Sequence, residues 1–193
     1  YKEITIMNKI KQIFLFKGAG FSIRESLEED LPIWYKWFNN PDINSYLFHG
    51  YKPNTYEEQR MFREHHLSGK NGKIIFSIIE NKKNNLIGTC SVNIDFMNPA
   101  KRAEISIIIG EKTMNTGPIY FGINHWLVSH CFNYLNINSI LATTSEDNSV
   151  TRLTLERVGF KKAGLMRSTC YKNGKYLNSV YYDILKKDWD KSQ

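Results

Sequence analysis

Strand-like and helical segments follow one another along this chain in an order that few folds accommodate. Alternation of apolar and polar residues indicates strands, and apolar residues spaced three and four apart indicate helices. The predicted elements are, in order, strand 21–26, helices 27–38 and 55–67, strands 73–80, 85–95 and 102–109, helix 117–134, strand 138–144, helix 149–158, an extended segment from residue 159, and strand 178–185.

Short turns join the three strands between residues 73 and 109, so these strands are expected to pair as antiparallel neighbours. The strand–helix–strand that follows requires one right-handed parallel crossover. We therefore predict an α/β (α+β) fold with a mixed, mostly antiparallel central sheet of about seven strands, flanked by about four helices. Where two neighbouring strands of such a sheet part, a ligand can enter between them.

Local signals mark several ends of these elements. Ser26 is predicted to cap the first helix, and Thr55 with Glu58 is predicted to form a capping box for the second. Asn173-Gly174 is a strong hairpin signal between the last two strands.

The chain has 193 residues and shows no internal repeat or low-complexity linker, which predicts one domain over residues 21–189. Residues 1–20 are interpreted as an extension, because the apolar run from residue 13 to residue 16 is too short for a signal peptide. The three cysteines are few and widely spaced, so neither a disulfide framework nor a metal site is expected. Cys90 and Cys131 are predicted to be small core residues in a reduced, cytoplasmic compartment.

Charge adds a constraint on partners. Lys and Arg number 26 against 19 Asp and Glu, which gives a formal charge of +7. This surplus favours an anionic partner, which could be a nucleic acid, a membrane surface or a phosphorylated small molecule. No apolar run approaches the roughly 20 residues of a membrane span.

The most informative stretch runs from Arg102 to Phe160. A strand leads through a short loop into a helix that begins at Gly117-Pro118. Proline suits a first helical position, glycine lets a ligand approach closely, and the first-turn N–H groups form an anion site beside Lys112. The alternative is an ordinary strand-to-helix turn.

Several segments in order carry a resemblance to a known family. They are Trp37–Asn44 (WFNNPDIN), Asn85–Thr89 (NLIGT) with Asn93–Asp95 (NID), Ala103–Ile105 (AEI), Glu146–Asn148 (EDN), and Leu155–Phe160 (LERVGF). Together they resemble the GCN5-related N-acetyltransferase (GNAT) superfamily over roughly residues 20–189. The first segment is similar to the subgroups that acetylate ribosomal-protein N termini and nucleotide-linked amino sugars.

The resemblance implies acetyl-CoA as the donor. Its pyrophosphate would bind the helix N terminus, where Lys112–Gly117 (KTMNTG) matches the family's glycine motif only at Gly117, with Asn115 in place of the first glycine. Asn tolerates a left-handed conformation, so a phosphate loop is feasible. The implied cofactor-binding residues are Ile108, Ile109, Gly110, Lys112, Asn115, Thr116, Gly117, Pro118, Ile119, Asn148 and Thr151.

For the reaction, the resemblance places Glu104 as the general base, directly or through water. The alternative is a solvated glutamate that faces Arg102 or Lys101. The family's usual tyrosine acid is replaced by Leu155, so Tyr120, Ser145 or a water molecule is left as the proton donor. Asn148, which the resemblance implies as a cofactor-binding residue, could instead serve only as the N-cap of the following helix.

The first helix and the loop after it line the acceptor cleft in this superfamily. The implied acceptor residues are Trp34, Trp37, Asn39, Asn40, Phe48, His49 and Tyr51. The two tryptophans have the alternative role of core residues, and the two asparagines that of turn formers.

The hypothesis is therefore an acetyl-CoA-dependent N-acetyltransferase that works by direct transfer in a ternary complex. A small amine, with or without a phosphate group and in particular a nucleotide-linked amino sugar, is the favoured acceptor, and a protein N terminus or another small amine is the alternative. A non-catalytic acyl-CoA-binding adaptor is the rival from another class, while no motif supports nucleic-acid or membrane binding. A monomer or a homodimer is expected.

Overall fold

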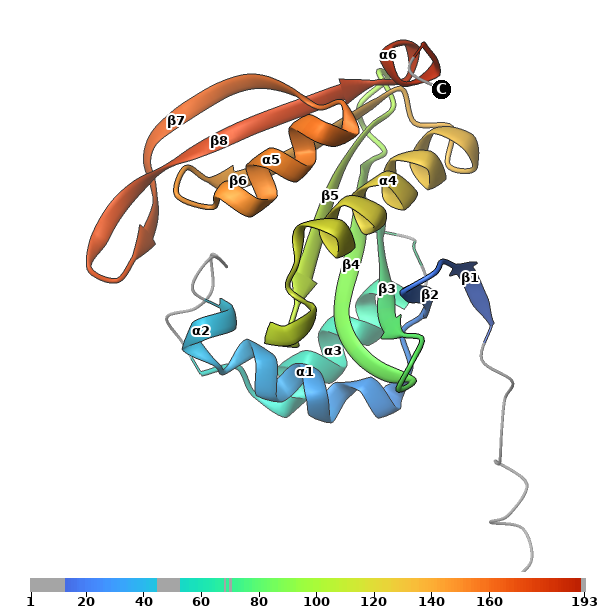
Figure 1. The fold of residues 1–193 in the computed structure, drawn as a ribbon, viewed down its shortest axis with the longest axis vertical. Coiled ribbons are helices and arrows are strands. Elements are labelled where there is room, and N and C mark those ends of the chain that lie inside the picture. Colours follow the sequence, from blue (N-terminus) through green and yellow to red (C-terminus); the bar gives the residue numbers. More distant parts are fainter. Residues whose placement is uncertain (1–12, 45–52, 68, 70, 192–193) are drawn as a thin grey trace, which may run out of the picture.

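The computed structural model describes residues 13–44, 53–67, 69 and 71–191, and Figure 1 shows their arrangement. The strands are β1 (Phe14–Lys17), β2 (Phe21–Glu25), β3 (Lys73–Glu80), β4 (Asn85–Asp95), β5 (Arg102–Ile109), β6 (Ser139–Ser145), β7 (Lys161–Lys172) and β8 (Lys175–Leu185). The helices are α1 (Leu31–Phe38), α2 (Pro41–Asn44), α3 (Tyr56–Leu67), α4 (Gly117–Asn133), α5 (Ser149–Val158) and α6 (Lys186–Asp190). Every predicted strand and helix is present, with ends that shift by a few residues.

Within the described part of the chain, eight strands form one sheet in the order β1-β2-β3-β4-β5-β6-β8-β7. Neighbouring strands are antiparallel except β5 and β6, which pair in parallel. The mixed, mostly antiparallel sheet is therefore confirmed, with one strand more than the seven expected. The additional strand, β1, comes from the segment 1–20 and pairs with β2.

Helices cover both faces of the sheet. The main hydrophobic core lies on the face that packs against α4 and α5, and it includes Phe76 and Ile123. A second core cluster on the other face joins Trp34 of α1 to Ile75 of β3. Ile75 and Phe76 belong to different clusters because successive residues of a strand point to opposite faces. None of the described helices is long and apolar enough to cross a membrane.

The start of α1 differs from the prediction, because Ser26 does not cap it. A 3-10 turn, Glu28–Asp30, precedes α1, and Asp30 is the N-cap residue. The Asp30 carboxylate accepts hydrogen bonds of 2.7 and 2.8 Å from the Arg24 guanidinium and one of 2.6 Å from Ser77 Oγ. A buried carboxylate needs such partners, so this ion pair, rather than a serine cap, fixes where the helix begins.

Other local signals are confirmed. Thr55 and Glu58 exchange hydrogen bonds of 2.9 and 3.1 Å, which is the predicted capping box of α3. Asn173 and Gly174 both have positive φ, as a tight two-residue hairpin turn requires. Cys90 and Cys131 lie in the main core as free thiols, and burial raises the pKa of the Cys131 thiol to about 12.

The parallel contact between β5 and β6 is short. Only Arg102–Glu104 pairs with Ser139–Leu141, after which the two strands diverge. From residue 105 to residue 109, β5 pairs with β4 along one edge, and no strand of the described structure pairs with its other edge. The sheet therefore opens between β5 and β6, as the mixed topology predicts.

Candidate active site

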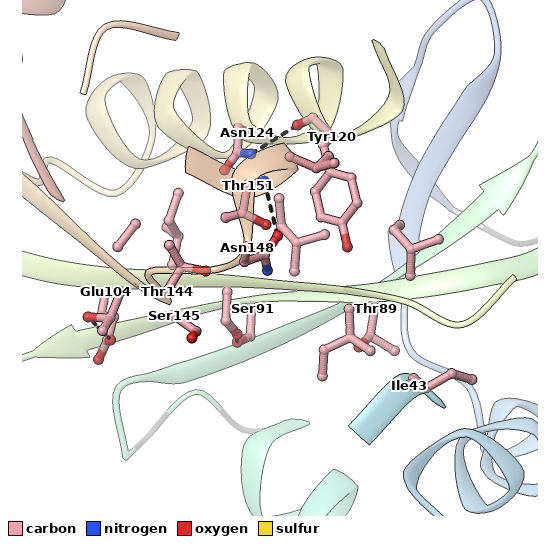
Figure 2. Close-up of a pocket in the computed structure, with 18 of the residues that line it drawn as sticks. Ile43, Thr89, Ser91, Glu104, Tyr120, Asn124, Thr144, Ser145, Asn148 and Thr151 are labelled. Carbon is pink, nitrogen blue, oxygen red and sulfur yellow. Dashed lines mark hydrogen bonds between the residues drawn. The ribbon is translucent and has the colours of Figure 1, made fainter. Parts of the chain in front are cut away.

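A cavity of about 610 Å³ opens at the split between β5 and β6 (Figure 2). It is lined from one face of the sheet by α4 and α5 and from the other by α1, α2 and α3, so it passes through the split. The predicted site residues that line it are Trp34, Glu104, Ile108, Ile109, Lys112, Asn115, Tyr120, Ser145, Asn148 and Thr151. Residues that were predicted to bind the acetyl donor and residues that were predicted to bind the acceptor therefore line the same cavity.

Polar side chains form a stripe along β4 and β5 on one wall of this cavity. Opposite pairs in the register are Ser91 with Ser106 and Asn93 with Glu104. The two serine hydroxyls lie 2.7 Å apart, within hydrogen-bonding distance. Sequence reasoning missed these residues, although the signal was there: Thr89, Ser91, Asn93 and Asp95 alternate with apolar or small residues along β4.

Glu104 is exposed and lies at the last residue pair that joins β5 to β6. Its carboxylate accepts a long hydrogen bond of 3.5 Å from Thr143 Oγ1. Arg102, which the solvated-glutamate alternative invokes as a partner, pairs instead with Asp95 at 3.3 Å. The carboxylate is thus directed at the open part of the sheet without a cation from the described residues bound to it.

A second cavity of about 520 Å³ continues the groove beyond Glu104. Its wall shares Asn93 and Glu104 with the first cavity and adds Phe96, Met97 and Arg102. Glu104 therefore stands at the junction of two spaces. A ligand whose reactive group lies at Glu104 can extend in either direction.

Ser145 ends β6, and its side chain is buried. Its hydroxyl donates a hydrogen bond of 2.7 Å to the Asp147 carboxylate, which also pairs with Lys172 at 3.2 Å. Burial would raise the pKa of Asp147, but the hydrogen bonds from Ser145 and Lys172 outweigh it and lower this pKa. Asp147 is therefore ionised at neutral pH, and the Ser145 proton is directed at it rather than at the cavity.

Tyr120 lies in the first turn of α4, next to the end of β5. Burial raises its pKa to about 12, which a hydrogen bond with the Ile109 backbone partly offsets, so the phenol stays protonated. Ile109 is five residues from Glu104, or about 16 Å along a strand. Figure 2 shows Tyr120 and Glu104 well apart, with Asn148 and Thr151 between them. The two side chains therefore cannot both contact one reacting carbon.

The start of α4 has the features of an anion site. Thr116 is the N-cap residue and makes no side-chain cap hydrogen bond, Pro118 lies in the first turn, and Ile119 is half-buried. First-turn N–H groups without a cap are available to an anion. A Cβ added to Gly117 would meet nothing within 4 Å, so space for a ligand lies in front of it. Asn115 has a φ of −78°, so it does not use the left-handed conformation that an asparagine tolerates.

Lys112 extends from the loop before α4 toward α2. Its ammonium pairs with Asp42 at 2.6 Å, and both side chains are exposed. The hydrogen bond and charge of Lys112 lower the pKa of Asp42. Because the pair is exposed, it is a weak contact that an incoming phosphate can replace.

The start of α5 lines the cavity beside Tyr120 (Figure 2). Asn148 is the N-cap, and its Oδ1 accepts a hydrogen bond of 3.3 Å from the Thr151 N–H. The N-cap alternative for Asn148 is therefore confirmed, and its amide NH₂ group makes no hydrogen bond to the described residues at the cavity wall. Leu155 lines the same wall and is almost fully buried, so it offers no proton to the cavity.

The tryptophans of the acceptor segment are buried in the second core cluster. Trp37 lies flat against Gly110, where an added Cβ would collide with the indole ring. Trp34 lines the cavity and is 1% exposed, and in the described structure its indole Nε1–H is buried without a hydrogen-bond partner. Trp37 thus packs the end of β5, whereas Trp34 retains a free donor group.

The asparagines of the same segment hold the chain in its turn. Asn39 exchanges hydrogen bonds of 2.8 and 2.9 Å with the backbone of Asn54, and Asn40 Oδ1 accepts one of 3.0 Å from the Asp42 N–H. Neither lines the cavity. Phe48, His49 and Tyr51 lie outside the described residues.

Within the residues that the structure describes, no three His, Cys, Asp or Glu side chains are grouped to bind a metal ion. The chemistry that the cavity offers is instead that of a carboxylate, hydroxyl groups, a helix N terminus and an open strand edge. An anionic ligand fits at the start of α4, an extended chain fits along β5, and a group that loses a proton fits at Glu104.

Comparison with known proteins identifies the family of this domain. Residues 23–181 match the family model of the acetyltransferase (GNAT) domain. The uncharacterized N-acetyltransferase p20 of Bacillus licheniformis is 26% identical over 174 residues, which cover 87% of this chain and 94% of the relative.

Solved structures share the fold. Spermidine N-acetyltransferase from Vibrio cholerae, in complex with CoA and spermine, superposes with a TM-score of 0.79 at 22% identity over 89% of this chain and 99% of its own. RimL, a ribosomal L7/L12 alpha-N-protein acetyltransferase in complex with CoA, superposes with a TM-score of 0.76 at 18% identity over 90% and 98%. The chain belongs to the GNAT acetyltransferase family and is an acetyl-CoA-dependent N-acyltransferase.

Proposed function

We propose that the chain acetylates a primary amine bound beside Glu104, whose carboxylate accepts the proton of the attacking amine. One observation carries this proposal: Glu104 stands exposed at the junction of both cavities while Arg102, its neighbour, is paired with Asp95. An amine attacks a thioester only in its neutral form. A carboxylate within hydrogen-bonding reach, directly or through one water, therefore speeds the reaction.

Acetyl-CoA, when bound, supplies the acetyl group as a thioester. The uncapped first turn of α4 and the open space at Gly117 would receive its phosphate groups, with Lys112 released from Asp42 to add positive charge. The edge of β5 at Ile108 and Ile109, which has no partner strand among the described residues, would pair with the amide groups of the pantetheine arm, as an added strand does, once Tyr120 releases the Ile109 backbone. The reactive thioester then lies in the cavity, past the split.

Two hydroxyls are candidates to donate a proton to the leaving thiolate. Tyr120 adjoins Ile109, so we assign it to the donor arm rather than to the reacting carbon. Ser145 lies on β6 within the cavity, but its hydroxyl must first break its hydrogen bond to Asp147. We expect a small contribution from Ser145, since a thiolate needs less help to leave than an alkoxide does.

The acceptor is best described as a primary amine. The sequence segment that favoured a nucleotide-linked amino sugar has structural roles in this fold, because Trp37 packs on Gly110 and Asn39 holds Asn54. An amino sugar thus rests on sequence likeness alone. The acceptors in the names of the two structural neighbours, a polyamine and a protein N terminus, support the broader class.

A protein N terminus is a specific second candidate. The cavity of about 520 Å³ beyond Glu104 is open at Phe96 and Met97, and both side chains are exposed. An amine at Glu104 could therefore belong to a chain that continues along this groove.

The experiment is an acceptor panel with purified protein and acetyl-CoA. It should contain a short peptide with a free N terminus, a polyamine, a nucleotide-linked amino sugar and simple amines, with release of the CoA thiol and product mass as readouts. We expect an N-acetylated product from at least one primary amine and none from its N-methylated tertiary analogue. Binding of CoA without any acetylated product would contradict the proposal.

A further inference from the structure

A lysine faces the same groove as Glu104. Lys73 begins β3 and lies opposite Asn93, which in turn lies opposite Glu104, so the three residues form one row across β3, β4 and β5. Residues directly opposite one another share a face of the sheet, and Lys73 and Glu104 both line the larger cavity. With neighbouring strands about 5 Å apart, their Cα atoms are separated by about 10 Å.

The turn before β3 fixes Lys73 in this row. Gly69 and Gly72 have φ values of +61° and +83°, which side-chain-bearing residues rarely adopt. A Cβ on Gly72 would collide with the carbonyl oxygen of Ile94, and the Ile94 N–H donates a hydrogen bond of 2.6 Å to the Gly72 carbonyl. The register of Lys73 against β4 is therefore set by packed backbone.

The ammonium group of Lys73 lies beneath α3. Its Nζ is 5.2 Å from the centre of the Phe62 ring, which itself packs edge-on against His66 at 4.4 Å. Burial lowers the pKa of His66, and the charge of Lys73 lowers it further. The wall beside Lys73 is thus aromatic, and its imidazole is uncharged at neutral pH.

The charges that line the cavity divide into two kinds. Asp42 and Lys112 neutralise one another in an ion pair of 2.6 Å at the donor end. Lys73 and Glu104 are the other two charged lining residues, and within the described structure neither forms an ion pair. The acceptor end of the cavity therefore presents one positive and one negative group, about two strands apart.

We propose that the acceptor is an amine that also carries an anionic group, a carboxylate or a phosphate, and that Lys73 binds this group while Glu104 receives the amine. The inference rests on the proposed function of Glu104 and adds the substrate class. It sets this chain apart from an enzyme for polyamines, since a polycation would meet the Lys73 ammonium. A charge-assisted hydrogen bond to the anion would also supply orientation.

The test compares matched acceptors on the full chain. One series contains ω-amino carboxylates of increasing length, a second the corresponding aminoalkyl phosphates, and a third uncharged alkylamines, with spermidine added. The variants are Lys73→Gln and Lys73→Glu, and Lys82→Gln in an exposed turn is the matched control. Acetyl transfer is measured as kcat/KM, and acceptor binding as the thermal shift in the presence of CoA.

We expect anionic amines to be the better acceptors, with an optimum chain length that reports the Lys73–Glu104 spacing. Lys73→Gln should lower kcat/KM for them by about 10-fold or more, through KM, and should leave alkylamines unchanged. Lys73→Glu should raise kcat/KM for spermidine. The carboxylate and phosphate series show which anion is bound.

Equal loss for charged and uncharged acceptors would make Lys73 a structural residue and overturn the inference. So would a wild-type preference for spermidine or alkylamines. If no amine is acetylated, the proposed function fails, and the thermal shift still decides the inference: anionic amines should stabilise the wild type and the Lys82→Gln control but not Lys73→Gln, and equal stabilisation would overturn it.

Discussion

Replacing Gly110 with alanine would place a methyl group inside the indole ring of Trp37. The contact is with a rigid ring that is itself 5% exposed, so neither partner can move aside without disturbing the second core cluster. Overpacking of this kind costs about 1–3 kcal/mol, and we expect the upper end because backbone and ring are both held. The Gly110 N–H also donates to the Ile87 carbonyl at 2.9 Å, which fixes the glycine against β4.

A double-mutant cycle isolates this contact. Gly110→Ala and Trp37→Leu should each lower the free energy of unfolding, measured by urea denaturation followed by circular dichroism. Together they should cost at least about 1 kcal/mol less than the sum of the two, because leucine leaves room for the methyl group. Since Gly110 leads into the loop before α4, Gly110→Ala should also raise KM for acetyl-CoA more than KM for the amine.

Additive effects, within about 0.5 kcal/mol, would refute the packing argument. The same variants also separate two interpretations of Trp37. If the tryptophan is a platform for the acceptor, Trp37→Leu should raise KM for the amine and leave the free energy of unfolding nearly unchanged. Packing on Gly110 predicts the opposite pattern.

Three further results follow from named contacts. Asp42→Asn frees Lys112 from its ion pair, and we expect isothermal titration to show tighter CoA binding, by no more than about five-fold. Ser145→Ala should lower kcat less than about 10-fold, because the hydroxyl is bonded to Asp147. Because the pKa of Asp147 is lowered, its pair with Lys172 stabilises the fold above the ordinary pKa of 3.8, and this stabilisation is lost as the pH falls below 3.8. The difference in unfolding free energy between wild type and Asp147→Asn should accordingly vanish in acid. A difference that stays constant with pH would contradict this.

The fold was largely predictable from the sequence because its signals are local. Alternation of apolar and polar residues located the strands. The capping box at Thr55 correctly marked the start of α3, and Asn173-Gly174 correctly marked the turn between β7 and β8. β1 was missed because four residues, Phe14–Lys17, carry too little pattern to indicate a strand before its partner is known. The cap at Ser26 failed because Arg24 pairs with Asp30, a contact between residues on two different elements.

Site residues could be predicted from the sequence only where the order of the strands already implies where they lie in space. Glu104 and the start of α4 flank the split that the strand order implies, and they line or border the cavity. Lys73 and Ser91 were missed because they enter the cavity from strands that only register brings next to β5. Trp37 matches a motif that was interpreted as functional, but its role in this fold is structural. Its indole packs on Gly110, a contact that the sequence does not reveal.

The central claim is that Glu104 receives the proton of the attacking amine, and the variant Glu104→Gln tests it most directly. The amide keeps the shape of the side chain but cannot accept a proton, so kcat/KM should fall by about 10²–10⁴-fold, while the CoA dissociation constant and the thermal stability stay unchanged. Glu25→Gln, at an exposed glutamate outside both cavities, should behave as wild type. Turnover of Glu104→Gln within about three-fold of wild type would contradict the account.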